Sequence, residues 1–336
     1  MTIRELSKIA GVSSATVSIV LNGKKGVSEG TRRHVLEIAR QYGYNNTRKA
    51  APSSNSILFI KYSKHGMMVE ENQGFVSSIM DAIEKRCRAG QYNLSIMLSD
   101  NDLENTIQSI DYSAYAGAIV LATELTEENY PYLRKIPIPF VAVDNPMTQL
   151  PYSTVVMDNT WDVHKAIRYC MECGYKSIAH FKSAIHTANM DERHRAFIQF
   201  TAEFGLHHDR EQHQFVLAPT MMGSYESMKN YLKRNPVLPE CAFADNDTIA
   251  IGAIKALKEF GYRIPHNIAV VGFDDIPFSA VNSPPLTTIH VHRELIGFMA
   301  VDHLCMLFEN PEFTGLKTRV TSDLVVRTSM NREQRA

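Results

Sequence analysis

Long apolar runs are missing from this sequence of 336 residues. A membrane-spanning helix needs about 20 consecutive, mostly apolar residues, and no stretch approaches that length. Near the N-terminus, Arg4, Glu5 and Lys8 interrupt the segment in which a secretory signal peptide would carry its apolar core. We therefore expect a cytoplasmic protein with no membrane partner.

Cysteine is scarce as well. The five cysteines are few and odd in number, so reduced thiols are expected rather than a disulfide framework. Cys170 and Cys173 form a C-x-x-C pair, but a structural zinc ion needs four ligands and there is no second pair. The histidines of segment 207–213, and His290 and His292, are expected in a solvated loop and at a strand edge. The sequence therefore predicts no metal site and no cofactor.

Motifs that bind phosphate or activate a serine nucleophile are also missing. The sequence contains no G-x-x-x-x-G-K-[ST], no G-x-G-x-x-G and no G-x-S-x-G pattern. No pair of side chains is recognisable as a nucleophile with its base. We therefore expect a protein that is not an enzyme.

Charge is present but unevenly distributed. Residues 1–49 contain nine Lys and Arg and three Glu, a net charge of +6. The remaining residues contain 26 basic and 33 acidic side chains, a net charge of −7. A basic N-terminal part on an acidic body indicates that the N-terminal part binds a polyanion. The alternative is a chance cluster on a solvated surface.

The pattern of the first 45 residues predicts three short helices. Apolar residues recur at helical spacing over 3–10, and Gly11 permits the tight turn that follows. Ser13 and Ser28 are favourable N-caps for a second and a third helix. Two short helices joined by a glycine-containing turn, with a third packed across them, form a helix-turn-helix.

The second of these helices has two different faces. Val17, Val20 and Leu21 are predicted to face the small core of the head. In a helix-turn-helix the N-terminal part of the second helix enters the DNA major groove, where hydroxyl groups suit phosphate contacts. The alternative is an amphipathic surface helix with no nucleic-acid role. The side chains predicted to face DNA are Ser13, Ser14, Ala15, Thr16 and Ser18.

Residues 2–44 resemble the DNA-binding head of the LacI/GalR family of bacterial transcription regulators. The shared pattern is A-G-V-S-x-x-T-V-S-x-V-L-N-G at 10–23, then V-S-x-x-T-R-x-x-V at 27–35, then a closing G-Y. This resemblance implies a homodimeric repressor whose two heads bind a palindromic operator in double-stranded DNA. It also implies that Ser14 and Ala15 lie at base edges. The residues that it places near phosphates are Ser13, Thr16, Ser18 and Asn22.

Two features depart from the family pattern. Where the family commonly has an Arg that reads guanine, this chain has Ile19, whose side chain donates no hydrogen bond but can contact a thymine methyl. We therefore expect a different base preference at that position. The linker at 45–56 has no Leu to wedge into the minor groove, and Pro52 interrupts a hinge helix. Arg48 remains able to contact phosphate or the minor groove.

Beyond residue 56 the pattern alternates between strands and helices. Apolar runs such as 56–62, 117–122 and 268–273 are typical of buried strands. The alternation predicts parallel sheets covered by helices, and roughly ten units are too many for one sheet. Ligands of such folds bind beyond the carboxyl ends of the strands. Polar residues follow the expected strands there, although several of them are expected only to cap helices or form turns: Asp144, Asn145, Asp158, Asn159, Asp245, Asp247, Asp274 and Asp275. Helices are expected at 75–87, 160–173, 193–204, 225–232 and 250–260.

The body is similar to the regulatory domain of the same family over segments such as 155–159, 242–247 and 252–275. The resemblance implies an N-terminal all-α helix-turn-helix head followed by an α/β, two-lobed, periplasmic-binding-protein-like (type I) domain. It also implies three crossings between the lobes and a small-molecule effector in the cleft. The expected domains are a head at 1–45, a linker or hinge at 46–56 and an effector-binding and dimerisation domain at 57–336, with lobe 1 at about 57–152 plus 287–318 and lobe 2 at about 153–286 plus 319–330.

The resemblance indicates effector-binding residues too. Arg193 occupies the arginine of the family's R-x-x-G-F pattern, and Asp247 ends its A-x-N-D pattern. Asp144 follows the last strand expected in lobe 1, Phe75 is suited to stack on a sugar ring, and Arg293 replaces a common neighbour of the site. The expected effector is a carbohydrate or a derivative. Two alternatives remain open: Arg193 in a salt bridge with an acid such as Asp247, and Phe75 as a core aromatic residue.

Three classes of function therefore remain. The favoured one is a transcriptional repressor controlled by an effector. The second is a sugar-binding transport protein, which the basic head and the missing signal peptide oppose. The third is an enzyme, such as a carbohydrate kinase joined to a helix-turn-helix head, which the missing phosphate loop opposes. No heptad repeat follows Ser329, so we expect a dimer rather than a tetramer joined by its tails.

Overall fold

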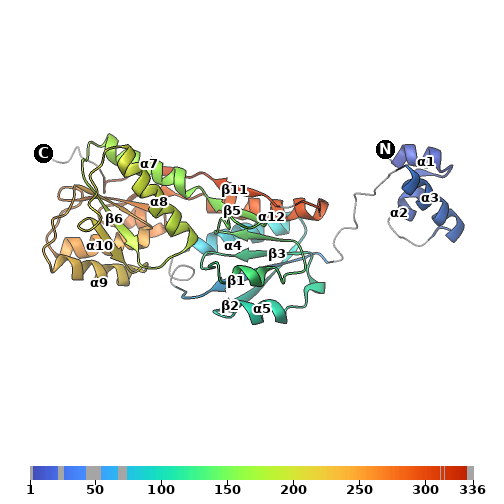
Figure 1. The fold of residues 1–336 in the computed structure, drawn as a ribbon, viewed down its shortest axis with the longest axis horizontal. Coiled ribbons are helices and arrows are strands. Elements are labelled where there is room, and N and C mark those ends of the chain that lie inside the picture. The colour runs from blue at the N-terminus through green and yellow to red at the C-terminus, as the bar shows by residue number, and fades with distance from the viewer. Residues whose placement is uncertain are drawn as a thin grey trace. The chain divides into compact units, whose positions relative to one another are not determined.

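A computed structural model describes residues 3–21, 26–42, 54–66, 74–310, 312–313 and 315–330. The chain divides into two compact units, and the second unit begins at Ser54 and contains all the described strands. Figure 1 shows the helical unit, here called the head, and the α/β unit, here called the body. Ser54 falls inside the linker expected at 46–56, of which residues 46–53 lie outside the described residues.

The head has the helices that its sequence pattern predicts. Gly11 adopts a φ of 63°, which lets the chain turn sharply between the first two helices. Ser13 accepts a hydrogen bond from the Thr16 N–H at 3.0 Å, and Ser28 caps the third helix in the same way. The helices are α1 (Ile3–Ile9), α2 (Ser14–Leu21) and α3 (Glu29–Gln41). The buried side chains between them are Leu6, Ala10, Val17, Val20, Val35 and Ala39.

The described strands of the body form two six-stranded sheets. Neighbouring strands are parallel, except that β10 and β12 are antiparallel. Apolar side chains are buried along the central strands because helices cover both faces. The first sheet runs, in spatial order, β11 (Lys317–Val320), β5 (Ser153–Met157), β4 (Phe140–Val143), β3 (Gly117–Leu121), β1 (Ser56–Ser63), β2 (Asn93–Asp100). The second runs β12 (Asp323–Val325), β10 (Thr287–His290), β9 (Ala269–Asp274), β8 (Cys241–Ala244), β6 (Ile178–Ser183), β7 (Gln214–Leu217).

We call the first sheet and its helices lobe 1, and the second sheet and its helices lobe 2. The helices of lobe 1 are α4 (Phe75–Ala89), α5 (Leu103–Ser109), α6 (Tyr130–Leu133) and α12 (Arg293–Glu309), with a 3-10 turn at Tyr112–Ala114. Those of lobe 2 are α7 (Asn159–Glu172), α8 (Ala188–Glu203), α9 (Met221–Leu232), α10 (Asp247–Glu259) and α11 (Pro277–Val281). Both α8 and α9 begin earlier than expected, because Thr187 and Thr220 cap them.

The strand order corrects the lobe boundaries expected from the sequence. Residues 153–157, assigned to lobe 2, form β5 between β4 and β11 in the first sheet. Residues 287–290, assigned to lobe 1, form β10 next to β9 in the second sheet, and all of β11 at 317–320 belongs to the first. The pairing partner of a strand depends on distant residues, so a local pattern of apolar residues does not specify it. The described chain crosses between the lobes after β5, after β10 and after β11.

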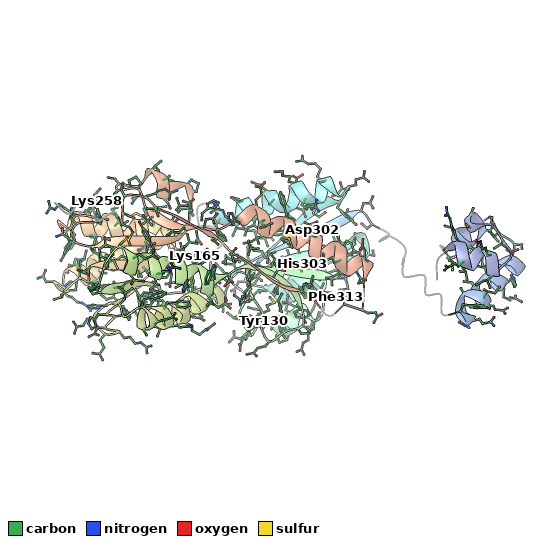
Figure 2. All side chains as sticks on the ribbon, turned by 90° about the horizontal axis from the view of Figure 1, so that it is seen from above. Tyr130, Lys165, Lys258, Asp302, His303 and Phe313 are labelled. Carbon is green, nitrogen blue, oxygen red and sulfur yellow. The ribbon has the colours of Figure 1, made fainter. Side chains whose placement is uncertain are left out.

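The third crossing is tied to α7 by polar contacts. Ser322 donates to the Asp162 carboxylate from its backbone N–H, at 3.1 Å, and from its hydroxyl, at 2.6 Å. Lys165, labelled in Figure 2, donates to the backbone carbonyl of Ser322 and lies 2.9 Å from the Asp162 carboxylate. These contacts hold the segment between β11 and β12 against lobe 2.

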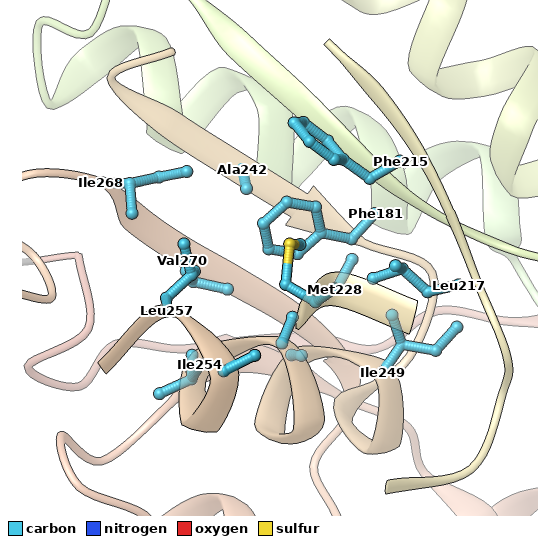
Figure 3. Packing of buried hydrophobic residues seen from close by; sticks show 14 of the residues in the cluster. Phe181, Phe215, Leu217, Met228, Ala242, Ile249, Ile254, Leu257, Ile268 and Val270 are labelled. Carbon is cyan, nitrogen blue, oxygen red and sulfur yellow. The ribbon is translucent and has the colours of Figure 1, made fainter. Parts of the chain in front are cut away.

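The core of lobe 2 makes its sheet a rigid support. Phe181 on β6 and Phe215 on β7 pack edge to face with ring centroids 5.7 Å apart, and Met228 of α9 and Ile254 and Leu257 of α10 belong to the same buried cluster (Figure 3). A sheet packed in this way holds the polar residues at its strand ends in fixed positions. Within the described ranges, no helix combines the length and the apolar character that a membrane span requires.

Candidate functional sites

The exposed surface of α2 lies at its N-terminal turn. Ser13, Ser14 and Ala15 are exposed, whereas Val17 and Val20 are buried in the core of the head, as predicted. Thr16, Ser18 and Ile19 are half-buried along the same helix. The arrangement leaves small side chains at the start of α2 accessible to a macromolecule.

Hydroxyl groups at this turn also serve the head itself. The Ser13 hydroxyl lies 2.9 Å from the Thr16 hydroxyl, in addition to accepting from the Thr16 N–H. The Ser14 hydroxyl lies 3.1 Å from that of Ser7 on α1. The local hydrogen bonds fix the orientation of these side chains before any partner binds. Two of the predicted DNA contacts, Asn22 and Arg48, lie outside the described residues.

A small cavity between the lobes brings together three of the five predicted effector residues. Phe75 at the start of α4, Asp144 just after β4, and Arg193 on α8 all line it. The free space in the cavity is only about 10 Å³, so its side chains are almost in contact with one another. The other lining residues are Thr123, Met157, Thr187, Asn189, Met190 and Asp274.

Arg193 is held by polar contacts on three sides. Its Nε donates to the Asn159 side-chain oxygen at 2.9 Å, and its Nη1 donates to the backbone carbonyl of Asp245. Its Nη2 lies 3.4 Å from Asp274 Oδ1, and the guanidinium carbon is 3.6 Å from the centroid of the Phe273 ring. The salt bridge that the sequence left open as an alternative does form, but with Asp274 rather than Asp247.

Asp144 sits at the lobe 1 side of the cavity in a left-handed backbone conformation, with φ at 64°. Its carboxylate accepts from the Thr123 hydroxyl at 2.6 Å and from the Asn189 amide at 2.7 Å. Burial raises the pKa of Asp144 to about 6, although the Thr123 hydrogen bond and the Arg193 charge lower it. The Asn189 amide comes from α8, so the contact joins the two lobes.

Asp247 lies apart from the lining of this cavity. It is fully buried at the start of α10, where it accepts from the Ser279 hydroxyl at 2.6 Å and from the Thr288 hydroxyl at 2.6 Å. The Ile276 N–H donates to the same carboxylate at 3.1 Å. Burial raises the pKa of Asp247 to about 7. With its acceptor positions occupied, the side chain serves to join α11 and β10 to α10.

Arg293 lies behind Phe75 instead of facing the cavity. Its guanidinium donates to the backbone carbonyl of Asp274 at 2.8 Å and to that of Asp275 at 3.2 Å. Its charged carbon is 5.7 Å from the centroid of the Phe75 ring. Phe75 is itself buried, so it is both a cavity-lining residue and a packed aromatic residue. Arg293 therefore supports the cavity from its outer side.

Sequence reasoning missed several residues of the cavity. Asn189 and Asp274 contact Asp144 and Arg193. Asp274 was expected among the polar residues at the strand ends but was not assigned to the effector, and Asn189 was not singled out. Asp274 had a usable signal, because it follows a buried apolar strand at the carboxyl edge of the sheet. Asn189 had none, since α8 was expected to begin only at Arg193.

A larger groove adjoins the cavity. It has a volume of about 840 Å³ and runs between the lobes, with Tyr130 and Met147 on the lobe 1 side and Asp191 and Glu192 on the lobe 2 side. Thr187 lines both the groove and the cavity. The groove and the cavity therefore lie next to each other between the lobes.

The cysteine and histidine residues give no second site. Cys170 is buried and Cys173 half-buried on α7, and both are free thiols. Among the described residues, no group of three or more His, Cys, Asp or Glu is arranged to hold a metal ion. His290 and His292 instead pair with Asp275 and Asp323 at the end of β10.

Family comparisons match the head and part of the body. Residues 2–46 match the bacterial regulatory proteins of the lacI family, and residues 167–330 match the periplasmic binding protein-like domain. The HTH-type transcriptional repressor PurR of Mannheimia succiniciproducens is 28% identical over 98% of this chain and 99% of its own. The PurR repressor of Glaesserella parasuis is 29% identical over 90% of this chain and 88% of its own.

Solved structures share the fold over nearly the whole chain. The complex of the transcriptional regulator CelR with cellobiose superposes with a TM-score of 0.73 and 21% identity, over 98% of this chain and 99% of that chain. The lac repressor dimer bound to operator and the anti-inducer ONPF gives a TM-score of 0.72 at 21% identity, with the same coverage. The chain therefore joins a head that matches the lacI family of bacterial regulatory proteins to a body that contains a periplasmic binding protein-like domain.

Proposed function

We propose that this chain is a sequence-specific transcriptional repressor that binds a palindromic operator as a homodimer. In this proposal residues 1–45 bind DNA, 46–56 link the domains, and 57–336 bind the effector and dimerise. The observation that carries the proposal is the exposed N-terminal turn of α2 on a basic three-helix head. The proposal assigns no chemical reaction to the chain.

The DNA contacts follow from the faces of α2. With Val17 and Val20 in the core, the exposed Ser14 and Ala15 are the side chains placed to approach base edges. Ile19, half-buried one turn later, offers a methyl-rich surface to a thymine methyl. The remaining proposed contacts are made to DNA phosphates or, for Arg48 of the linker, to phosphate or the minor groove. The residues proposed to make them are Ser13, Thr16, Ser18, Asn22 and Arg48.

The proposed effector is a hydroxyl-rich small molecule, such as a carbohydrate, bound at the inter-lobe cavity. Carboxyl groups of Asp144 and Asp274 face a single guanidinium, so the lining offers more acceptors than donors. This favours ligand hydroxyl groups and disfavours a phosphate group. Phe75 supplies a ring face for the apolar side of a sugar. The cellobiose bound by the structural relative CelR supports this class.

Binding at the cavity is proposed to act on DNA affinity through the angle between the lobes. A small-molecule site normally encloses a few hundred Å³ or more, far above the about 10 Å³ now free, so the lobes must part to admit a ligand. A ligand that prefers one separation of the lobes shifts the population toward it. In a dimer, that shift alters the spacing of the two heads and hence operator affinity.

The operator proposal is tested by selecting sequences from random duplex DNA with the native chain and with Ile19→Arg. We expect an inverted repeat in both, with one base pair in each half-site changing to one that presents guanine to Arg. Leu36→Arg is the control, because it adds the same charge at an exposed position on α3 and should leave the preferred sequence unchanged. If the native chain selected no palindromic sequence from the random DNA, the operator proposal would be ruled out.

The effector proposal is tested by thermal shift with neutral sugars, sugar phosphates and nucleobases. A binding sugar present at about 100 times its Kd should raise the Tm by on the order of 5 °C. Arg193→Gln and Asp144→Asn should each abolish the shift, whereas the control Arg263→Gln, at an exposed position after α10, should retain it. Stabilisation by sugar phosphates or nucleobases alone would overturn the assigned class.

A further inference from the structure

The face of α8 that carries Arg193 also carries two contacts between the lobes. Asn189, Glu192 and Arg193 are three and four residues apart, so they lie on the same side of the helix. Asn189 reaches Asp144 in lobe 1, and Glu192 reaches Arg319 on β11, which pairs with β5 in the first sheet. One helix of lobe 2 is therefore bonded to two separate strand ends of lobe 1.

The contact between Glu192 and Arg319 is a bidentate ion pair. Arg319 Nη1 donates to Glu192 Oε2 at 3.0 Å, and Nη2 donates to Oε1 at 2.6 Å. The Glu192 side chain is only 9% exposed, and that of Arg319 is 34% exposed. Burial acts to raise the pKa of Glu192, but the hydrogen bonds from Arg319 and Asn159 outweigh it and the pKa is lowered. Glu192 is thus charged and dependent on its partner.

Asn159 joins this ion pair to the effector cavity. It is completely buried at the first turn of α7, and its amide donates to Asn189 Oδ1 at 2.9 Å and to Glu192 Oε2 at 3.0 Å. Its carbonyl oxygen accepts from Arg193 Nε at 2.9 Å. Every hydrogen-bonding group of this side chain except one lone pair is used. Moving Glu192 therefore moves the acceptor that orients Arg193.

We propose that Glu192, Arg319 and Asn159 form an inter-lobe latch, in which the ion pair holds the lobes together and Asn159 positions Arg193. When the lobes part, Glu192 loses both charge-assisted hydrogen bonds from Arg319, which opposes opening. The latch and the Asp144–Asn189 contact meet at Asn159, so they open together. A ligand at the cavity, if the proposed function holds, then changes lobe separation through this network.

Lobe separation is measured directly, with neither ligand nor DNA. Spin labels are placed at Glu128→Cys in lobe 1 and Gln199→Cys in lobe 2, both exposed, in a Cys173→Ser and Cys305→Ser background. Labelled chain is diluted with unlabelled chain, so that each distance measured by electron double resonance lies within one chain. The native latch should give one principal distance.

Breaking the latch should add a second, longer distance between the two spin labels. Arg319→Gln and Glu192→Gln should each increase the fraction of the longer distance at least about fivefold. The double variant should add little further, because both changes remove the same interaction. Arg319→Lys keeps the positive charge but loses the bidentate geometry. It should therefore give a fraction of the longer distance between those of the native chain and Arg319→Gln. A purely local structural role for Glu192 would not produce this graded order.

The control breaks an ion pair inside lobe 1. Lys135→Gln and Glu104→Gln remove an exposed pair between α5 and the end of α6, and the distance distribution should not change. If Arg319→Gln and Glu192→Gln both had the native circular dichroism and the native distribution of spin-label distances, the latch would be overturned. That result would leave the operator and effector proposals standing, because neither was measured.

Discussion

At the scale of single residues, Asp247 is the side chain whose surroundings depart most from the expectation. Its carboxyl group was expected to meet a ligand, yet three donors of the chain itself surround it. The Gly272 backbone lies so close that a Cβ there would be 2.1 Å from Asp247 Oδ1. Asp247, at the start of α10, is therefore enclosed by α11, β9 and β10.

The enclosure of Asp247 predicts a pH effect on stability. Burial raises the pKa of Asp247 to about 7, above the 3.8 expected in the unfolded chain. Between these two pH values the carboxyl group is protonated in the folded chain but ionised in the unfolded chain. Stability from this group is present below about pH 4 and is lost as the pH rises to about 7, by at most about 1.4 kcal/mol per pH unit. Asp247→Asn should flatten this decline, measured by urea unfolding from about pH 4 to about pH 8.

Lys233→Gln provides a contrast, since it changes an exposed charge at the end of α9, away from this enclosure, and should keep the native pH profile. An Asp247→Asn variant whose stability falls with pH as steeply as the native chain's would contradict the assignment. The Asp144 carboxyl, with a pKa of about 6, contributes in the same direction and persists in both variants.

Three of the five effector residues expected from the sequence lie together in the structure. Arg193, Asp144 and Phe75 were expected in one site and do line one cavity. Asn159 was expected only as one of several polar residues at the strand ends, and Asn189 was not expected in the site at all. Their roles depend on contacts with residues 30 or more positions away in the sequence. Amide side chains suit helix caps and loops equally well, so residue type alone does not distinguish these roles.

At the scale of elements, the close contact between α4 and α12 depends on Gly297. A Cβ at this position would lie 2.6 Å from the Ala82 Cβ and 2.8 Å from the Ile79 carbonyl oxygen. The backbone of α12 therefore lies directly against α4, and any side chain forces the helices apart.

Gly297→Ala should destabilise the body by about 1–3 kcal/mol, because the added methyl group meets backbone atoms that cannot move aside. Chemical denaturation followed by circular dichroism measures the loss. Gly30→Ala on α3 is the matched control: no atom lies within 4 Å of its added Cβ, so it should not destabilise the chain. Equal stability of the native chain and Gly297→Ala would show that the helices separate freely.

Elements were predictable where periodicity is regular. The three helices of the head and most strands of the body occur where the pattern placed them. The long helix α12 was missed because its apolar residues lie on all sides, which leaves no 3.6-residue period to detect. The short edge strands β11 and β12 were missed because their burial pattern is mixed.

At the scale of the whole molecule, the positive charge of residues 1–49 predicts strong dependence of operator binding on salt. Each phosphate contact releases counterions, so affinity should fall at least about tenfold between about 50 mM and about 200 mM salt. Fluorescence anisotropy of a labelled operator measures the slope. Lys8→Gln with Arg33→Gln, both exposed on the head, should reduce it.

Matched changes in the body, Lys135→Gln with Lys258→Gln, should leave the salt slope unaltered. If the body variants reduced the slope as much as the head variants, the basic head would not be the DNA-binding surface. The charge asymmetry was visible in the sequence alone, whereas the division of strands between two sheets required the three-dimensional pairing.

The order in which the strands appear along the chain bears on protein synthesis. Both sheets receive an edge strand from residues 317–325, and the buried Ser329 hydroxyl donates to the Val270 carbonyl at 2.6 Å. A ribosome therefore releases the complete helical head long before either lobe has its final strand. A truncated translation product ending before residue 317 would carry the proposed DNA-reading helix but lack a finished sensor, and we expect cellular proteases to remove it.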